Sequence, residues 1–227
     1  MPNGPLSLAA KLYLLAWDTE RLALTSTSYL AQLVRAGALT ELAQRGLLLD
    51  ADGVAKPVDD ANTGDPVLDK LLELIGESRP QSWKTWVGRQ PRFTLDEVCD
   101  QLASAGYLRV ETKRLLGLFP RRTIRLERSG VPVVEELRGG AQRVLHSSGD
   151  VAEVPVQDAA LVALAAAGEL RTVLSAREAK DRAARIDTLA ERGAATAPEL
   201  RKVISELRTA LTVAVTTTVV TTIVVNN

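Results

Sequence analysis

The chain has few of the residues on which catalytic and metal sites are usually built. Its 227 residues include one cysteine, Cys99, and one histidine, His146. A single cysteine excludes an internal disulfide and favours a reducing compartment. One cysteine and one histidine are also too few for a nitrogen- and sulfur-ligated metal site. The glycine patterns of nucleotide-binding loops are missing. We therefore expect no metal, no cofactor and no enzymatic activity.

His146 is the only residue that invites a catalytic interpretation. It precedes Ser147, Ser148 and Asp150, the residue types of a serine-histidine-aspartate triad. Groups so close in sequence do not generally converge as residues from separate elements do, and the nucleophile-elbow pattern is absent. A solvated loop is the simpler interpretation.

The chain also lacks an excess of charge of either sign. Lysine plus arginine and aspartate plus glutamate each total 28. No overall field therefore draws the protein toward nucleic acid or lipid, and electrostatic targeting must come from local clusters. The N-terminus has no basic stretch ahead of an apolar one, so no secretion signal is expected. These features predict a cytoplasmic protein.

Long apolar runs are rare, and the exception is at the C-terminus. Residues 210–225 are all alanine, leucine, valine, isoleucine or threonine, with six threonines. A membrane-spanning helix needs about 20 predominantly apolar residues. This segment is shorter and diluted by threonine, so a core helix with a frayed or extended end is favoured over an anchor.

The composition is that of a globular protein, with 46% apolar and 25% charged residues. We expect a single domain over residues 1–227, flexible at 1–5 and 226–227, that is mainly helical with short β-hairpins. Apolar spacing and end signals predict the following helices: Leu6–Trp17, Tyr29–Arg45, Pro66–Ile75, a short one with Trp83 and Trp86, Thr94–Gly106, Val131–Leu145, Pro155–Ala167, Ala176–Leu189 and one from Pro198 onward.

Several polar residues mark where these helices begin. Asp65 is placed to cap a helix whose first residue is Pro66. Capping boxes are predicted at Thr94 to Glu97 and at Ser175 to Glu178. Two hairpins are also expected: one around the turn Asp50–Gly53, and one that pairs Leu108–Glu111 with Thr123–Leu126.

The second hairpin carries the strongest local charge. Seven basic residues between 109 and 128 face only Glu111 and Glu127, a net excess of 7 − 2 = +5. Four apolar residues lie among them: Leu115, Leu116, Leu118 and Phe119. Apolar side chains between cations suit a membrane interface, where each basic residue near an anionic leaflet contributes about 1 kcal/mol. The alternative is a core hairpin with a solvated basic rim.

A helix followed by a basic hairpin also resembles the recognition helix and wing of a winged helix-turn-helix protein. DNA binding is therefore the second functional hypothesis. However, the presumed recognition helix contains Asp96, Glu97 and Asp100 and has no lysine or arginine after Thr94. Those carboxylates would repel phosphates. A nucleic-acid partner is not expected.

Three sequence blocks, taken in order, resemble the Golgi phosphoprotein 3 family. They are Val34–Gly46, with its Glu-Leu-Ala-Gln-Arg-Gly ending, Thr63–Asp69 with Thr-Gly-Asp-Pro, and Leu102–Leu108. The resemblance extends over nearly the whole chain. It implies a mainly helical single domain, a site for the phosphatidylinositol 4-phosphate headgroup, and a hydrophobic hairpin used in membrane contact and self-association.

The resemblance also assigns roles to particular residues. Arg35 and Arg92 match headgroup-binding arginines, and Lys113 and Arg114 are further candidate headgroup contacts. Leu115, Leu116, Leu118 and Phe119 match the membrane-inserting hairpin. Ser26 stands where eukaryotic members have a pocket tryptophan, and Leu95 where they have a second arginine. These two departures bear on phosphoinositide specificity, because shaped pockets and paired arginines distinguish phosphate patterns.

Together these inferences predict a bacterial peripheral membrane protein on the inner face of a membrane. Its expected partners are anionic lipid headgroups, other membrane proteins in an adaptor role, and a second copy through the hairpin. For Arg35, a headgroup contact and an exposed helix position are equally supported. Arg45, beside a helix C-terminus, favours a stability role. Trp83 and Trp86 are more typical of core residues than of a site.

Overall fold

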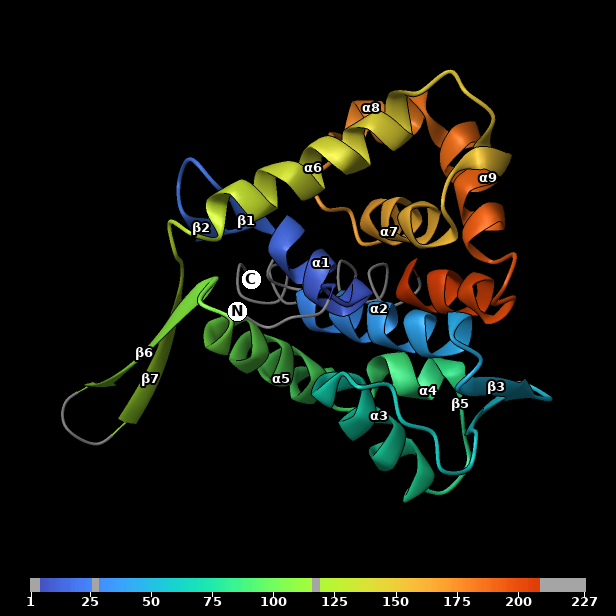
Figure 1. Ribbon diagram of the computed structural model, residues 1–227, viewed down its shortest axis with the longest axis horizontal. Helices are drawn as coiled ribbons and strands as arrows, with labels where there is room; N and C mark the ends of the chain where they lie inside the picture. The colour runs from blue at the N-terminus through green and yellow to red at the C-terminus, as the bar shows by residue number, and fades with distance from the viewer. Residues whose placement is uncertain (1–4, 26–28, 116–118, 209–227) are drawn as a thin grey trace, which may run out of the picture.

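The computed structural model describes residues 5–25, 29–115 and 119–208, and within 112–121 it describes strand backbone but no side chains. The protein is mainly helical, as predicted (Figure 1). Its helices are α1 Leu8–Leu15, α2 Leu30–Gln44, α3 Pro66–Gly76, α4 Trp83–Gly88, α5 Pro91–Ser104, α6 Val131–His146, α7 Val156–Ala167, α8 Ala176–Asp181 and α9 Ala183–Gly193. A 3-10 turn spans Val151–Glu153, and residues 199–208 are helical.

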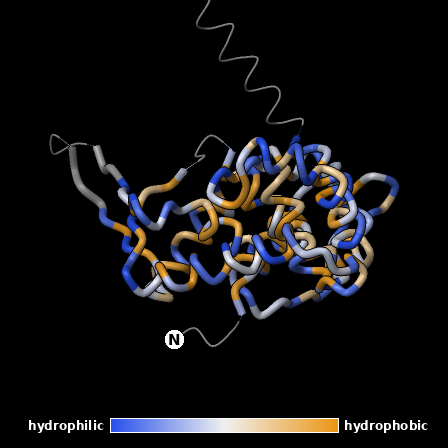
Figure 2. Tube along the Cα trace, turned by 90° about the horizontal axis from the view of Figure 1, so that it is seen from above, coloured by the Kyte–Doolittle hydropathy of each residue, from blue (hydrophilic) through white to orange (hydrophobic). Residues whose placement is uncertain are grey.

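The centre of the molecule is formed by α1 and α2. Nearly every residue of α1 is buried, and α2 is buried from Leu33 to Ala43. A helix that is apolar on all sides must be covered on all sides. Figure 1 shows how this is achieved: α4 and α5 lie on one side of the α1–α2 pair, and α6, α7 and α9 on the other. Along the trace, apolar segments run through the interior and hydrophilic ones lie mainly outside (Figure 2).

The described part of the chain also forms three small antiparallel sheets. β1 Trp17–Asp18 pairs with β2 Ala23–Leu24, and β3 Leu48–Ala51, β4 Val54–Pro57 and β5 Gln81–Ser82 form a second sheet. The third is the hairpin of β6 Leu108–Leu115 and β7 Phe119–Leu126, whose register runs from Leu108 opposite Leu126 to Leu115 opposite Phe119. Its strands are longer than predicted, and it projects from the body (Figure 1).

The start of α5 differs from the prediction. The helix begins at Pro91, not at a Thr94 cap, and Gln90 before it has a left-handed backbone with φ of 46°. Proline is preorganised for the first turn of a helix, so the chain starts the helix three residues early. Thr94 is therefore inside the helix, where it is 1% exposed.

Other predicted helix ends are confirmed or corrected. The Asp65 side chain accepts hydrogen bonds from the backbone N–H groups of Val67 and Leu68, and the Ser175 to Glu178 capping box is present. The single helix predicted over Ala176–Leu189 is instead two, because α8 ends at Asp181 and α9 begins at Ala183.

The tryptophans are core residues, as predicted. Trp83 and Trp86 are 1% and 0% exposed, and the Trp83 indole N–H donates to Asp50 Oδ1 at 2.6 Å. No helix within the described residues is long and apolar enough to cross a membrane. The threonine-rich segment 210–225 lies outside the described residues.

Candidate functional site

A cavity of about 640 Å³ opens between α1, β2, α2, α5 and β7. Its apolar wall includes Leu24, Leu30 and Ile124, and its polar residues include Gln90, Arg92 and Asp96. Of Arg35 and Arg92, the two predicted headgroup residues whose side chains are described, Arg92 lines it. Leu95, at the position where the resemblance expects a second arginine, lines the cavity too.

Arg92 projects an exposed guanidinium at this cavity because it occupies the second residue of α5. The carboxylates that follow Arg92 along α5 pair with residues of other elements. Asp96 lies 3.8 Å from Arg122 of β7, and Glu97 lies 2.6 Å from Lys70 of α3. Among the described residues no carboxylate forms an ion pair with Arg92. Its charge therefore remains available to an anion.

Arg35 lies behind the cavity wall and is completely buried. Its Nε donates to Thr94 Oγ1 at 2.7 Å, and its terminal nitrogens donate to the Trp86 carbonyl at 3.4 Å and the Gln90 carbonyl at 3.1 Å. Burial lowers the pKa of Arg35 to about 10, so the side chain is a cation at neutral pH. Arg35 thus ties the end of α4 to the start of α5.

This burial argues against the exposed helix position considered for Arg35. A direct headgroup contact by Arg35 stays a prediction. The Arg35 side chain is inaccessible in this conformation. What the geometry shows is that Arg35 holds the turn that immediately precedes Arg92. The charge of Arg35 also has no carboxylate partner among the described residues, which adds positive potential behind this wall.

The cavity floor holds Tyr13 and Cys99. Burial raises the pKa of the Cys99 thiol to about 11, and burial together with the neighbouring thiol also raises the pKa of the Tyr13 phenol. Both groups are therefore neutral at physiological pH. A thiol held neutral is a weak nucleophile.

The hairpin's charge is partly neutralised by neighbouring carboxylates. Arg109 pairs with Glu127 at 2.5 Å, and Arg122 pairs with Asp96 and Asp100 of α5. The same contacts occupy two of the three acidic residues that count against a DNA-recognition helix. Glu127 is already counted in the +5 excess read from the sequence, so it is the approach of Asp96 and Asp100 that makes the local excess smaller in the folded protein.

The other predicted hairpin residues have side chains that lie outside the described part of the structure. Leu116 and Leu118 lie outside the described residues, as does Ser26. For Lys113, Arg114, Leu115 and Phe119 only the strand backbone is described. That these side chains share a face with Arg92 stays a prediction.

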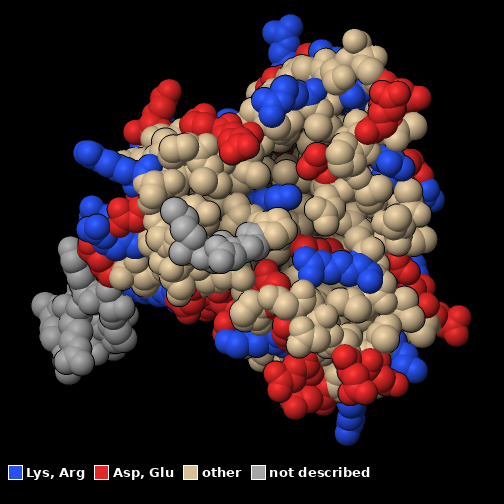
Figure 3. Space-filling view, viewed as in Figure 1, with Lys and Arg blue, Asp and Glu red and all other residues tan. Residues whose placement is uncertain are grey.

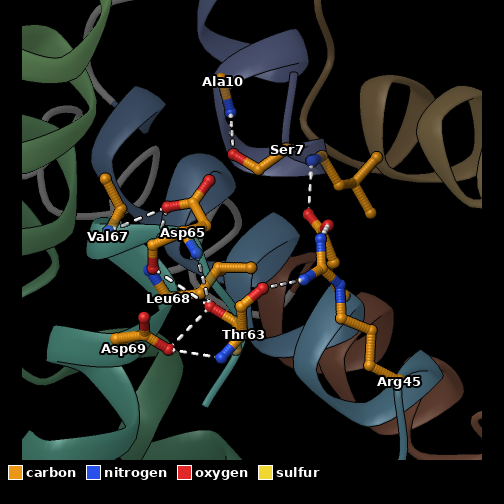
Figure 4. A network of polar contacts seen from close by, with 10 residues as sticks. Ser7, Ala10, Arg45, Thr63, Asp65, Val67, Leu68 and Asp69 are labelled. Atoms are coloured by element: carbon orange, nitrogen blue, oxygen red, sulfur yellow. Dashed lines mark hydrogen bonds and ion pairs between the residues drawn. The ribbon is translucent and has the colours of Figure 1, made fainter. Parts of the chain in front are cut away.

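A second polar network explains two of the recognisable sequence blocks. The buried Glu41 carboxylate accepts the Leu8 backbone N–H at 2.6 Å and pairs with Arg45, while Arg45 Nη1 donates to the Thr63 carbonyl at 3.1 Å. Thr63 in turn donates to Asp69 at 2.7 Å (Figure 4). The network joins the start of α1, the end of α2 and the start of α3, so Arg45 has the stability role predicted for it.

The surface offers no large field of one sign on the face shown in Figure 3, where basic and acidic side chains are interspersed.

His146 ends α6, and its Nε2 lies 3.4 Å from Glu178 Oε1 at the start of α8. No group of three or more potential metal-ligating side chains occurs within the described residues.

The protein is thus a mainly helical single domain that carries a cavity with Arg92 in its lining and a projecting β-hairpin, and these features define its class. Within that class, the chain belongs to the Golgi phosphoprotein 3 (GPP34) family, which it matches over residues 8–207. A comparison with curated proteins gave no match. Family membership confirms the resemblance inferred from the sequence blocks.

Sequence reasoning missed several residues around the cavity. Tyr13 and Leu24 come from α1 and β2, far from Arg92 in sequence, and no local pattern indicates their convergence. Gln90 and Pro91, which also line the cavity, were missed although a local signal existed. The stretch Arg-Gln-Pro-Arg-Phe at 89–93 combines two cations and an aromatic at the start of α5.

Proposed function

We propose that this protein is a peripheral membrane protein that binds anionic phospholipid headgroups at the Arg92 cavity, in the manner of a phosphatidylinositol 4-phosphate site. The observation that carries the proposal is the exposed Arg92 side chain, which forms no ion pair with any described residue, lines a cavity of about 640 Å³ and is backed by the buried cation of Arg35. A phosphate oxygen is a natural partner for such a guanidinium. No reaction is part of the proposal.

The hairpin supplies the second half of the proposal. Leu115, Leu116, Leu118 and Phe119 would enter the lipid while Lys113 and Arg114 meet headgroups, which would hold the protein reversibly on the inner face of a membrane. The projection of β6 and β7 from the helical body supports this arrangement. Recruitment of other membrane proteins, as an adaptor, would follow from such docking.

Vesicle sedimentation tests the headgroup contact. Vesicles of phosphatidylcholine alone are compared with vesicles that also contain phosphatidylinositol or phosphatidylinositol 4-phosphate. Wild type should bind the anionic vesicles, and Arg92→Gln should bind them about tenfold more weakly, the loss expected for one charge-assisted contact of about 1.4 kcal/mol. Arg177→Gln is the control, because it removes the same charge from α8, where Arg177 is 91% exposed and lies 3.6 Å from Asp181.

The hairpin is tested with Leu116→Asp and Phe119→Asp in the same assay, which should reduce binding to every vesicle type. Equal partition of wild type into neutral and anionic vesicles would contradict the headgroup proposal. Binding of duplex DNA with a steep salt dependence would instead favour the winged-helix alternative.

A further inference from the structure

Two of the four large apolar side chains that stay exposed in the described part of the chain belong to the β3–β4 hairpin. Leu49 is 51% exposed and Val58 is 38% exposed. The other two, Leu22 and Phe93, lie in the β1–β2 turn and in α5. Figure 1 shows the β3–β4 hairpin at the end of the molecule opposite the β6–β7 hairpin. Single exposed apolar residues are ordinary on a protein surface, whereas a contiguous apolar patch marks an interaction site.

The strand register places Leu49 and Val58 on the same face of the hairpin. Leu49 lies directly opposite Lys56, and the ladder continues to Val58, whose N–H donates to the Leu47 carbonyl at 3.0 Å. Because opposite residues share a face and side chains alternate along a strand, Leu49, Lys56 and Val58 point to one side. Leu48 on the other side is 1% exposed and belongs to the core. The solvent side, which we call the outer face, is formed by Leu49, Ala51, Val54, Lys56 and Val58.

The charged side chains beside the outer face have no partners within the described part of the protein. Lys56 is exposed, as are Asp52 in the hairpin turn and Asp59 and Asp60 after the hairpin. None of the four forms an ion pair with a described residue. Three carboxylates against one ammonium would repel an anionic membrane or a nucleic acid. An occupant of this face must therefore be apolar at its centre and must bring both a cation and an anion.

A second copy of the chain meets these requirements. Lys56 precedes Val58 by two residues, and Asp60 follows it by two. A two-fold axis beside Val58 therefore brings the ammonium of each copy to the carboxylates of the other, because a two-fold interface makes every contact twice. The apolar side chains of the two copies would meet at the centre, where contact with each other removes them from water.

We propose that two copies of the protein associate through the outer face, with Leu49 and Val58 at the centre and Lys56 paired with Asp59 and Asp60 across the two-fold axis. This inference is independent of the headgroup proposal and of self-association through the β6–β7 hairpin. The patch is small beside the interfaces of obligate dimers, so the association is weak and depends on protein concentration.

Sedimentation velocity of the full chain, from micromolar to millimolar concentration, tests the apolar centre. The average mass of wild type should rise from the monomer value of 24.4 kDa toward twice that value. Leu49→Thr with Val58→Thr removes the apolar centre but keeps good strand formers, and this variant should stay monomeric. Leu22→Asn with Phe93→Gln is the matched control, because it removes the other two exposed apolar side chains with residues that suit a left-handed turn and a helix. The control should associate like wild type.

A charge exchange tests the pairing itself. Lys56→Glu places like charges across the axis, and so does Asp59→Lys with Asp60→Asn, where asparagine suits the left-handed backbone at 60, φ 54°. Each variant alone should associate about tenfold more weakly than wild type. An equimolar mixture of the two should recover association, because unlike charges then face each other at both contacts. Lys180→Glu, which reverses an exposed charge on α8, should associate like wild type.

The outcomes decide the inference one way or the other. A wild type that stays monomeric up to the highest concentration overturns it. Association that persists unchanged in the outer-face variants also overturns it, because the copies then meet elsewhere. A mixture that associates no better than its two components would refute the two-fold pairing of charges. Circular dichroism confirms that the variants fold, which we expect because the substituted side chains are exposed.

Discussion

Arg35 inside α2 and Arg45 at its C-cap differ in whether a carboxylate balances their charge. Arg45 pairs with Glu41 and donates to the Thr63 carbonyl, so its charge is neutralised within the fold. Arg35 is more deeply buried, yet only carbonyl and hydroxyl oxygens receive its hydrogen bonds. Arg45 is therefore part of a structural clamp in which Glu41 balances its charge. Arg35 leaves positive charge beside a cavity, which is a property of an anion site.

The largest effect on stability is expected at the clamp. Glu41→Ala leaves the Leu8 N–H without its acceptor and Arg45 without its counter-charge. Breaking a buried pair in this way destabilises a protein by about 3 kcal/mol or more; because Arg45 is 33% exposed, we expect a value near the lower end. Urea denaturation followed by circular dichroism measures it. A loss within 0.5 kcal/mol, the ordinary scale of surface changes, would contradict the clamp.

An intermediate effect is expected at the cavity. Arg35→Met removes three hydrogen bonds, but it also removes a charge that is unfavourable to bury. The free energy of unfolding should fall by about 1–2 kcal/mol, less than for Glu41→Ala under the same conditions. A larger loss than at Glu41 would reverse the comparison between the two arginines.

The same variant should loosen the turn before α5. Cys99 reports this, because its thiol lines the cavity and burial raises its pKa to about 11. Its thiolate fraction at pH 8 is therefore small, about one in a thousand, and a thiol reagent should label wild type slowly. Labelling should be faster in Arg35→Met and unchanged in Arg45→Met.

The smallest stability effect is expected at Arg92. Arg92→Gln removes an exposed side chain without an ion pair among the described residues, so the free energy of unfolding should change by less than about 0.5 kcal/mol. Denaturation of this variant alongside Arg177→Gln provides the check. A loss as large as that of Arg35→Met would assign Arg92 to structure and not to ligand binding.

Local signals predicted most of the fold. Asp65 with Pro66 and Ser175 with Glu178 begin helices where their side chains satisfy free N–H groups, a chemistry contained within a few residues. The α5 prediction was wrong by three residues because Pro91 begins the helix, and Thr94 instead lies inside it, buried against Arg35 in a contact across 59 positions. Similarly, the hairpin's charge excess was overestimated because Asp96 and Asp100 approach Arg122 from another element.

By itself, the amino-acid sequence determined the helical class, the main helix ends, the family and the candidacy of Arg92. These follow from apolar periodicity, capping chemistry and contiguous blocks, all of which act over short separations. Only the tertiary structure decided that Arg45 is clamped by Glu41, whereas Arg35 is buried with no carboxylate partner among the described residues. Which charges meet, and which stay unpaired, depends on contacts between distant segments.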